Sequence, residues 1–121
     1  MPKRILEVCR LDLIDYEKAL NLQKETENLV IAGNKRDTLF LLEHPHTYTI
    51  GRRAKENGIL ASDQILQNIG AKVFETNRGG KVTYHGLGQL VGYAIINLSQ
   101  CKEDVHLYVR NLEEVLIRTM N

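Results

Sequence analysis

The chain has 121 residues, 43% of them hydrophobic and 26% charged, which is an ordinary length and composition for one globular domain. Sixteen basic against fifteen acidic residues give a net charge of +1, so the basic excess typical of a nucleic-acid-binding protein is missing. No apolar run approaches the roughly 20 residues of a membrane span, and the first residues lack the apolar core of a signal peptide. We therefore expect a cytoplasmic protein that binds neither nucleic acid nor membranes.

The first third of the chain predicts a strand, a helix and a second strand. Residues 4–11 mix apolar and polar positions, which favours a strand near the edge of a sheet. Residues 16–32 are rich in helix formers. Asp15 can cap this helix through its carboxylate, and Gly33 suits its end. Residues 38–43 are apolar on both faces, which indicates a central strand covered on both sides.

The segment after this strand contains two closely spaced histidines. Pro45 cannot donate a backbone hydrogen bond, so the strand breaks there. His44 and His46 would share a face if the chain were extended, and with His85 they could form a metal site of three histidines. No carboxylate spacing supports such a site, and single histidines are more often hydrogen-bonded structural residues. We therefore expect no bound metal.

A local basic cluster, formed by Arg52, Arg53 and Lys55, follows a short strand predicted at 48–50. Such a cluster is either a solvated loop or a contact for an acidic partner or a phosphate. The residues themselves leave both interpretations open.

The two cysteines, Cys9 and Cys101, are far apart and form no CxxC motif. This spacing argues against a disulfide framework and against a zinc site made of thiolates. We expect two reduced thiols, because a nucleophilic cysteine needs a neighbouring base or cation.

The second half of the chain continues the alternation of helices and strands. Ser62 can cap a short helix at 63–69, and a strand follows at 71–76. The run at 90–98 is apolar on both faces, so it is predicted to be a second central strand and to hold much of the core. A helix with a clear apolar stripe begins near residue 103 or 104 and continues to the last residue.

Residues 77–93, with the sequence NRGGKVTYHGLGQLVGY, concentrate glycines and polar side chains before an apolar run. The stretch contains neither GxxxxGK[ST] nor GxGxxG, so the usual nucleotide-phosphate loops are not supported. If 82–85 is extended, Thr83 and His85 face one way while Val82 and Tyr84 face the other. The stretch is then either a glycine-rich hairpin without a ligand or the wall of a cavity for an apolar tail with a polar head.

This stretch resembles the signature of the octanoyltransferases of lipoate biosynthesis, also called lipoyl(octanoyl) transferases or the lipoate-protein ligase B family. The matching positions are Arg78, Gly79, Gly80, Thr83, Tyr84, His85, Gly88, Gln89 and Tyr93. The upstream LLEHPHTYTIGR resembles the family's Glu-His…Thr-x-Gly segment. Leu87 stands where the family usually has proline, which should loosen this turn without removing a functional group.

The resemblance implies an α/β (α+β) fold, a mixed β-sheet with flanking helices, shared with the catalytic domain of biotin- and lipoate-protein ligases. It implies transfer of an octanoyl group, through a cysteine thioester and without a cofactor, from octanoyl-acyl carrier protein to a lysine of a lipoyl domain. The acceptors would be E2 subunits of 2-oxoacid dehydrogenases and the glycine cleavage H protein. The substrate-binding residues implied are Arg78, Gly79, Gly80, Lys81, Val82, Thr83, Tyr84 and His85.

The catalytic lysine and cysteine of the family belong to motifs that would lie beyond Asn121, and neither Cys9 nor Cys101 lies in a matching motif. We therefore expect residues 1–121 to be the N-terminal portion of a single catalytic domain, with the C-terminal part missing and no activity alone. Two alternatives remain open: an ATP-dependent lipoate- or biotin-protein ligase of the same fold, and a non-catalytic acyl-binding protein.

Overall fold

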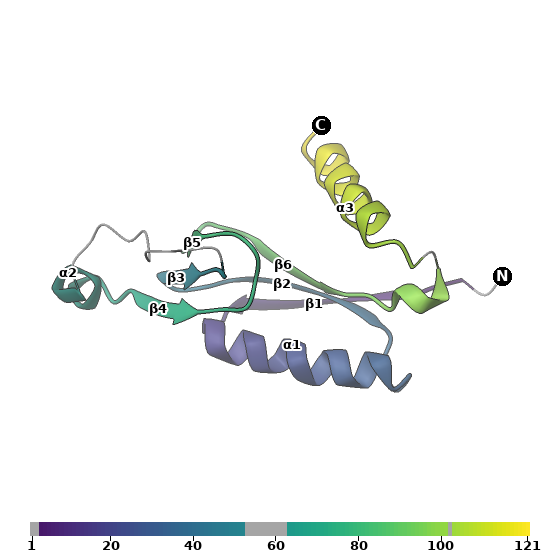
Figure 1. The fold of residues 1–121 in the computed structure, drawn as a ribbon, viewed down its shortest axis with the longest axis horizontal. Coiled ribbons are helices and arrows are strands. Elements are labelled where there is room, and N and C mark those ends of the chain that lie inside the picture. Colours follow the sequence, from purple (N-terminus) through teal and green to yellow (C-terminus); the bar gives the residue numbers. More distant parts are fainter. Residues whose placement is uncertain (1–2, 53–62, 102) are drawn as a thin grey trace.

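The computed structural model describes residues 3–52, 63–101 and 103–121, and Figure 1 shows its elements. Arg53, Lys55 and the predicted cap Ser62 lie outside the described residues. In chain order the elements are β1 (Leu6–Leu13), α1 (Tyr16–Ile31), β2 (Asp37–Glu43), β3 (Thr47–Ile50), α2 (Asp63–Asn68), β4 (Lys72–Glu75), β5 (Val82–His85), β6 (Val91–Ile95), a 3-10 turn (Leu98–Gln100) and α3 (Val105–Met120). The predicted mixture of strands and flanking helices is confirmed.

The first sheet has the strand order β1-β2-β6. Strand β1 runs parallel to β2, and β2 runs antiparallel to β6. The prediction that 38–43 forms a central strand is confirmed, as is the edge position of β1. The run at 90–98 was expected to be central as well. Within the described part of the chain, however, β6 pairs only with β2, so its apolar pattern reflects packing on α1 and not two strand neighbours.

Helix α1 covers one face of this sheet (Figure 1). Ala19 of the helix packs with Phe40 and Leu42 of β2 as a buried cluster, and Tyr93 and Ile95 of β6 join it as half-buried neighbours. These strand residues alternate along β2 and β6, because every second side chain points to the same face. The core therefore lies between α1 and the first sheet.

The predicted cap of α1 is wrong in its detail. Asp15 occupies the N-cap position, but its side chain makes no capping hydrogen bond. Asp104, at the start of α3, does cap, since its carboxylate accepts from the backbone amide of Leu107 at 3.1 Å.

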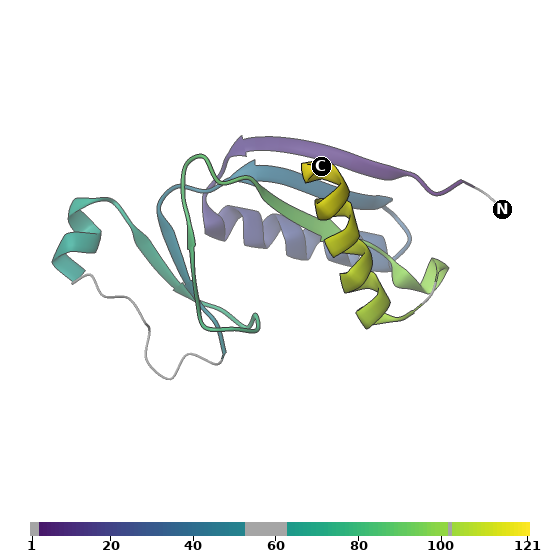
Figure 2. The ribbon, with the colours of Figure 1, turned by 90° about the horizontal axis from the view of Figure 1, so that it is seen from above.

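The second sheet has the strand order β4-β3-β5 and lies at one end of the first sheet, with α2 farther out (Figure 2). Strand β3 runs parallel to β4 and antiparallel to β5. His44, Pro45 and His46 separate β2 from β3, as the proline predicted. Thr47 and Thr49 of β3 are fully buried, so one face of this small sheet points into the molecule.

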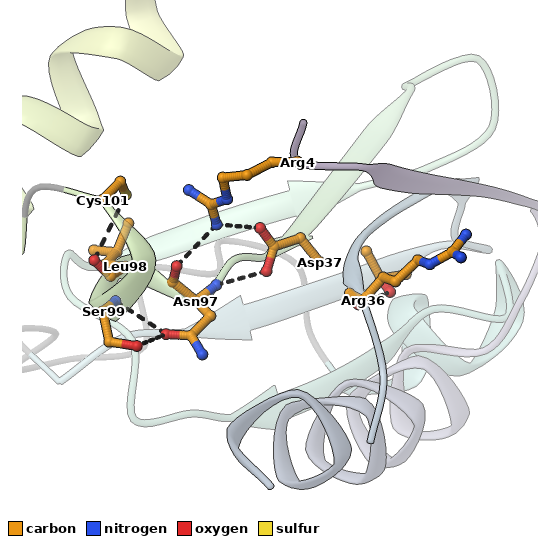
Figure 3. A network of polar contacts seen from close by, with 8 residues as sticks. Arg4, Arg36, Asp37, Asn97, Leu98, Ser99 and Cys101 are labelled. Carbon is orange, nitrogen blue, oxygen red and sulfur yellow. Dashed lines mark hydrogen bonds and ion pairs between the residues drawn. The ribbon is translucent and has the colours of Figure 1, made fainter. Parts of the chain in front are cut away.

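A polar network fastens the start of β2 to the end of β6, at the opposite end of the first sheet (Figure 3). The carboxylate of Asp37 pairs with the guanidinium of Arg4 and accepts from the backbone amide of Asn97 at 2.9 Å. Arg4 also donates to the carbonyl of Asn97 at 2.9 Å. This network joins β2 and β6 at the end of the first sheet that is far from the second sheet (Figure 1).

Helix α3 lies on the side of the first sheet opposite α1 (Figures 1 and 2). The predicted helix is confirmed, and its apolar stripe includes Leu112, Leu116 and Met120. None of its residues is buried, and Met120 is 79% exposed. Among the described residues, no helix is long and apolar enough to cross a membrane.

Candidate functional site

A cavity of about 680 Å³ lies where α1, the second sheet and β6 meet. This volume is within the usual range for small-molecule sites. The cavity is lined by Tyr16, Leu20, Gln23, Lys24, Thr49, Glu75, Thr76, Asn77, Arg78, Thr83, His85 and Tyr93. It therefore brings side chains of α1, β3 and β6 together with those of the glycine-rich stretch.

The alternation predicted for 82–85 is confirmed. Thr83 and His85 line the cavity, while Tyr84 projects from the other face of β5. There the Tyr84 ring lies 5.1 Å from the ring of Tyr48, its partner on β3, and its hydroxyl hydrogen-bonds Nδ1 of His46. Of the predicted substrate-binding segment, Arg78, Thr83 and His85 thus belong to the described lining.

His85 is surrounded by side chains of α1, of β3 and of the connection between β2 and β3. Its ring stacks on Tyr16 of α1 with centroids 6.1 Å apart, and it meets the edge of His44 at 5.6 Å. Its Nε2 lies 3.4 Å from the hydroxyl of Thr49. Burial lowers the pKa of His85, and the nearby His44 and Arg78 lower it further, whereas a hydrogen bond to the Gln89 side chain raises it. The imidazole is therefore neutral at pH 7.

His44 holds the inner wall of the cavity in place. It is fully buried, and its Nδ1 lies 2.7 Å from the carbonyl oxygen of Ile14. A carbonyl only accepts, so Nδ1 donates to it, and Nε2 is left to pair with the hydroxyl of Tyr93 at 2.8 Å. Burial, and to a smaller extent Tyr16, raise the pKa of Tyr93 to about 12. Tyr93 therefore stays protonated and serves as the donor.

Arg78 enters the cavity wall, but its guanidinium is directed at the protein. It donates to the carbonyl of Thr49 at 2.6 Å and to the carbonyl of Gly79 at 2.8 Å. Gly79, Gly80, Lys81 and Val82, also predicted to bind substrate, fall outside the described lining. A Cβ added to Gly51 would clash with the Gly80 carbonyl, whereas a Cβ added to Gly79 would meet no atom within 4 Å. The glycines thus allow two backbone segments to approach each other.

The three histidines considered for a metal site are not brought together. His44 and His85 are neighbours, whereas His46 lies with Tyr84 on the other face of the second sheet. Within residues 3–52, 63–101 and 103–121, no group of three or more His, Cys, Asp or Glu could hold a metal ion. Cys9, half-buried in β1, and Cys101, exposed after β6, are reduced and lie outside the described cavity lining.

Sequence reasoning did not place Tyr16 or Thr49 in the cavity wall, nor did it assign Tyr93 to the inside of the cavity. Tyr16 was assigned to a scaffold helix, and Thr49 to a short strand without chemistry. Only the pairing of Thr49 with Thr83 across β3 and β5 could have placed it. Tyr93 matched the resemblance as a position, and its spacing from Val91 and Ile95 along β6 indicated the face it takes.

Comparison with known proteins shows the family to which this chain belongs. Residues 15–121 match the family model described as the lipoyl protein ligase A/B catalytic domain. The chain therefore belongs to this family, and the fold class expected from the resemblance is confirmed.

Individual relatives narrow the similarity further. The chain is 49% identical over 115 residues to an octanoyltransferase of Caldicellulosiruptor saccharolyticus, covering 95% of this chain and 49% of that protein. It is 48% identical over 116 residues to an octanoyltransferase of Alkaliphilus metalliredigens, covering 96% and 53%. The chain thus spans about half the length of the curated relatives it matches. A weaker likeness, with a TM-score of 0.49 and 17% identity, relates 74% of this chain to 29% of P. falciparum LipL1 in complex with lipoate.

Proposed function

We propose that this chain forms the acyl-binding part of an octanoyltransferase of lipoate metabolism. The observation that carries the proposal is the cavity, because the RGGKVTYH motif sends Thr83 and His85 into it and Tyr16 and Tyr93 complete its walls. The sequence identity of 48–49% between this chain and the octanoyltransferases supports the same assignment.

The chemistry of the cavity suits a neutral acyl ester. The rings of Tyr16 and Tyr93 and the side chain of Leu20 offer apolar surface for a hydrocarbon chain. The neutral His85 can hydrogen-bond an acyl carbonyl without placing a charge beside that chain. A charged imidazole would be costly there, because burial opposes it.

The complete reaction that we propose is transfer of an octanoyl group from octanoyl-acyl carrier protein to a lysine of a lipoyl domain. The donor thioester would first pass its acyl group to a cysteine thiolate, releasing the carrier thiol. The lysine amine would then attack the new thioester and release the cysteine. We assign neither step to Cys9 or Cys101, since neither belongs to the described lining. Arg52, exposed beside the glycine-rich loop, is proposed to contact the acidic carrier.

Binding of octanoyl-acyl carrier protein, measured by calorimetry, tests the proposal. Thr83→Tyr fills the cavity with a side chain that the strand position can accommodate, and we expect it to abolish binding of the acylated carrier. Tyr84→Phe alters the other face of the same strand and should leave binding unchanged. Equal binding of the acylated and unacylated carrier by the unaltered chain would refute an acyl site.

Two chemical assays separate the remaining alternatives. We expect no stable octanoyl thioester on either cysteine after incubation with octanoyl-acyl carrier protein, and trapped octanoylation of Cys9 or Cys101 would contradict this. We also expect no octanoyl- or lipoyl-adenylate with ATP. Formation of an adenylate would contradict the transferase assignment and support an ATP-dependent ligase.

A further inference from the structure

Arg78 donates hydrogen bonds to its own protein from all three nitrogens of its guanidinium. Its Nη2 donates to the carbonyl of Thr49 at 2.6 Å, to the Thr49 hydroxyl at 2.9 Å and to the carbonyl of Lys81 at 3.1 Å. Its Nε reaches the same hydroxyl at 3.1 Å, and its Nη1 donates to the carbonyl of Gly79 at 2.8 Å. All acceptors are neutral oxygens of β3 or of the glycine-rich loop. The planar five-donor fork of arginine suits such a set.

The backbone adds further links between the same two segments. The amide of Gly51 donates to the carbonyl of Lys81, and the amide of Arg52 donates to the carbonyl of Arg78 at 3.0 Å. Before the loop, the amide of Thr76 donates to the carbonyl of Ile50 at 2.9 Å. The segment 76–81 is therefore joined to the end of β3 at Thr76, Arg78 and Lys81, immediately before β5 begins.

We propose that Arg78 is a positioning residue of the cavity: it fixes the 76–81 loop on β3 through Thr49, and so sets where Thr83 and His85 stand, in place of binding a ligand by its charge. The inference rests on the proposed function for the nature of the ligand. An acyl thioester carries no charge, so its recognition needs no cation. The guanidinium nitrogens Nε, Nη1 and Nη2 already donate hydrogen bonds to carbonyl and hydroxyl oxygens of the protein.

Two ligands that differ only in head-group charge separate positioning from charge recognition. Octanoate is anionic, and S-octanoyl-N-acetylcysteamine is a neutral thioester. Arg78→Gln should weaken binding of both by the same factor, about tenfold or more, because the cavity wall is displaced for either ligand. Arg78→Lys should fail to restore either affinity, since a single ammonium cannot span the acceptors on β3 and the loop. A loss confined to octanoate, restored by lysine, would overturn the proposal.

A ligand-free measurement keeps the inference separate from the proposed function. In Arg78→Gln we expect hydrogen exchange at the amides of Gly51 and Arg52 to become at least about tenfold faster, because these amides bond to the released loop. Thr49→Val removes the shared hydroxyl acceptor and should accelerate the same amides. Lys72→Gln, an exposed cation on β4, is the control and should change nothing. Unchanged hydrogen exchange in both Arg78→Gln and Thr49→Val would refute the positioning role of Arg78, even if acyl ligands bind.

A spectroscopic readout tests whether Arg78 acts through the cavity wall. The His85 ring should change its NMR chemical shifts in Arg78→Gln, since β5 follows the loop directly, while global unfolding of the variant is checked by circular dichroism. Identical His85 shifts in folded Arg78→Gln and in the unaltered chain would contradict positioning.

Discussion

Tyr93→Phe should destabilise the fold, because it removes the hydrogen-bond partner of a buried histidine nitrogen. The Tyr93 hydroxyl is 2.8 Å from Nε2 of His44, and His44 is fully buried. After the substitution this buried ring nitrogen loses its hydrogen-bond partner. An unsatisfied buried polar group costs about 1–3 kcal/mol, against about 1 kcal/mol for an average hydrogen bond. We therefore expect the free energy of unfolding to fall by about 1–3 kcal/mol.

The same number predicts a shift in thermal stability. An unfolding entropy of about 2.1 cal/mol/K per residue gives roughly 0.25 kcal/mol/K for a domain of this size. The expected loss therefore lowers the melting temperature by roughly 4–12 °C. Urea denaturation and thermal melts, both followed by circular dichroism, measure the two quantities on the same protein.

Tyr84→Phe is the matched control for this prediction. Its hydroxyl also pairs with a histidine nitrogen, that of His46, but both residues are exposed and water can take the place of the lost group. We expect a change below about 0.5 kcal/mol. Equal effects of Tyr93→Phe and Tyr84→Phe, or no effect of either, would refute the reasoning that burial of His44 makes its hydrogen bond matter.

Three further predictions follow from the same structure. Gly51→Ala should cost about 1–3 kcal/mol in urea denaturation, because the new Cβ meets the Gly80 carbonyl, whereas Gly79→Ala has open space and should be nearly neutral. His85 has a folded pKa below its unfolded value of 6.5, so the unfolded state takes up protons first as pH falls; stability should drop below about pH 6.5, and His85→Gln should flatten this dependence. Asp37→Ala should lower the unfolding free energy by about 1–3 kcal/mol, since it leaves the part-buried backbone amide of Asn97 without its acceptor.

Local patterns in the sequence predicted the parts of the site that depend on strand alternation. The two-residue repeat placed Thr83 and His85 on one face of β5 and Tyr84 on the other, and the structure confirms it. The central position of β2 followed from apolar residues on both faces. These features need only neighbouring residues, so a single sequence carries them.

Features that depend on distant residues could not be predicted in this way. The hydrogen bonds from Arg78 to Thr49 join residues 29 positions apart, and they become visible only once β3 and β5 pair. His44 was considered as a metal ligand, yet Ile14 and Tyr93 satisfy its ring. Apolar runs also do not report strand order, which is why β6 was placed centrally.

Photo-crosslinking with a diazirine-bearing octanoyl thioester tests the central claim most directly. The account predicts that the label attaches to cavity residues, chiefly Tyr16, Thr83, His85 and Tyr93, and that excess octanoyl-acyl carrier protein suppresses it. Labelling that spreads over the exposed apolar face of α3, or that the acylated carrier leaves unchanged, would show that the cavity is not the acyl site.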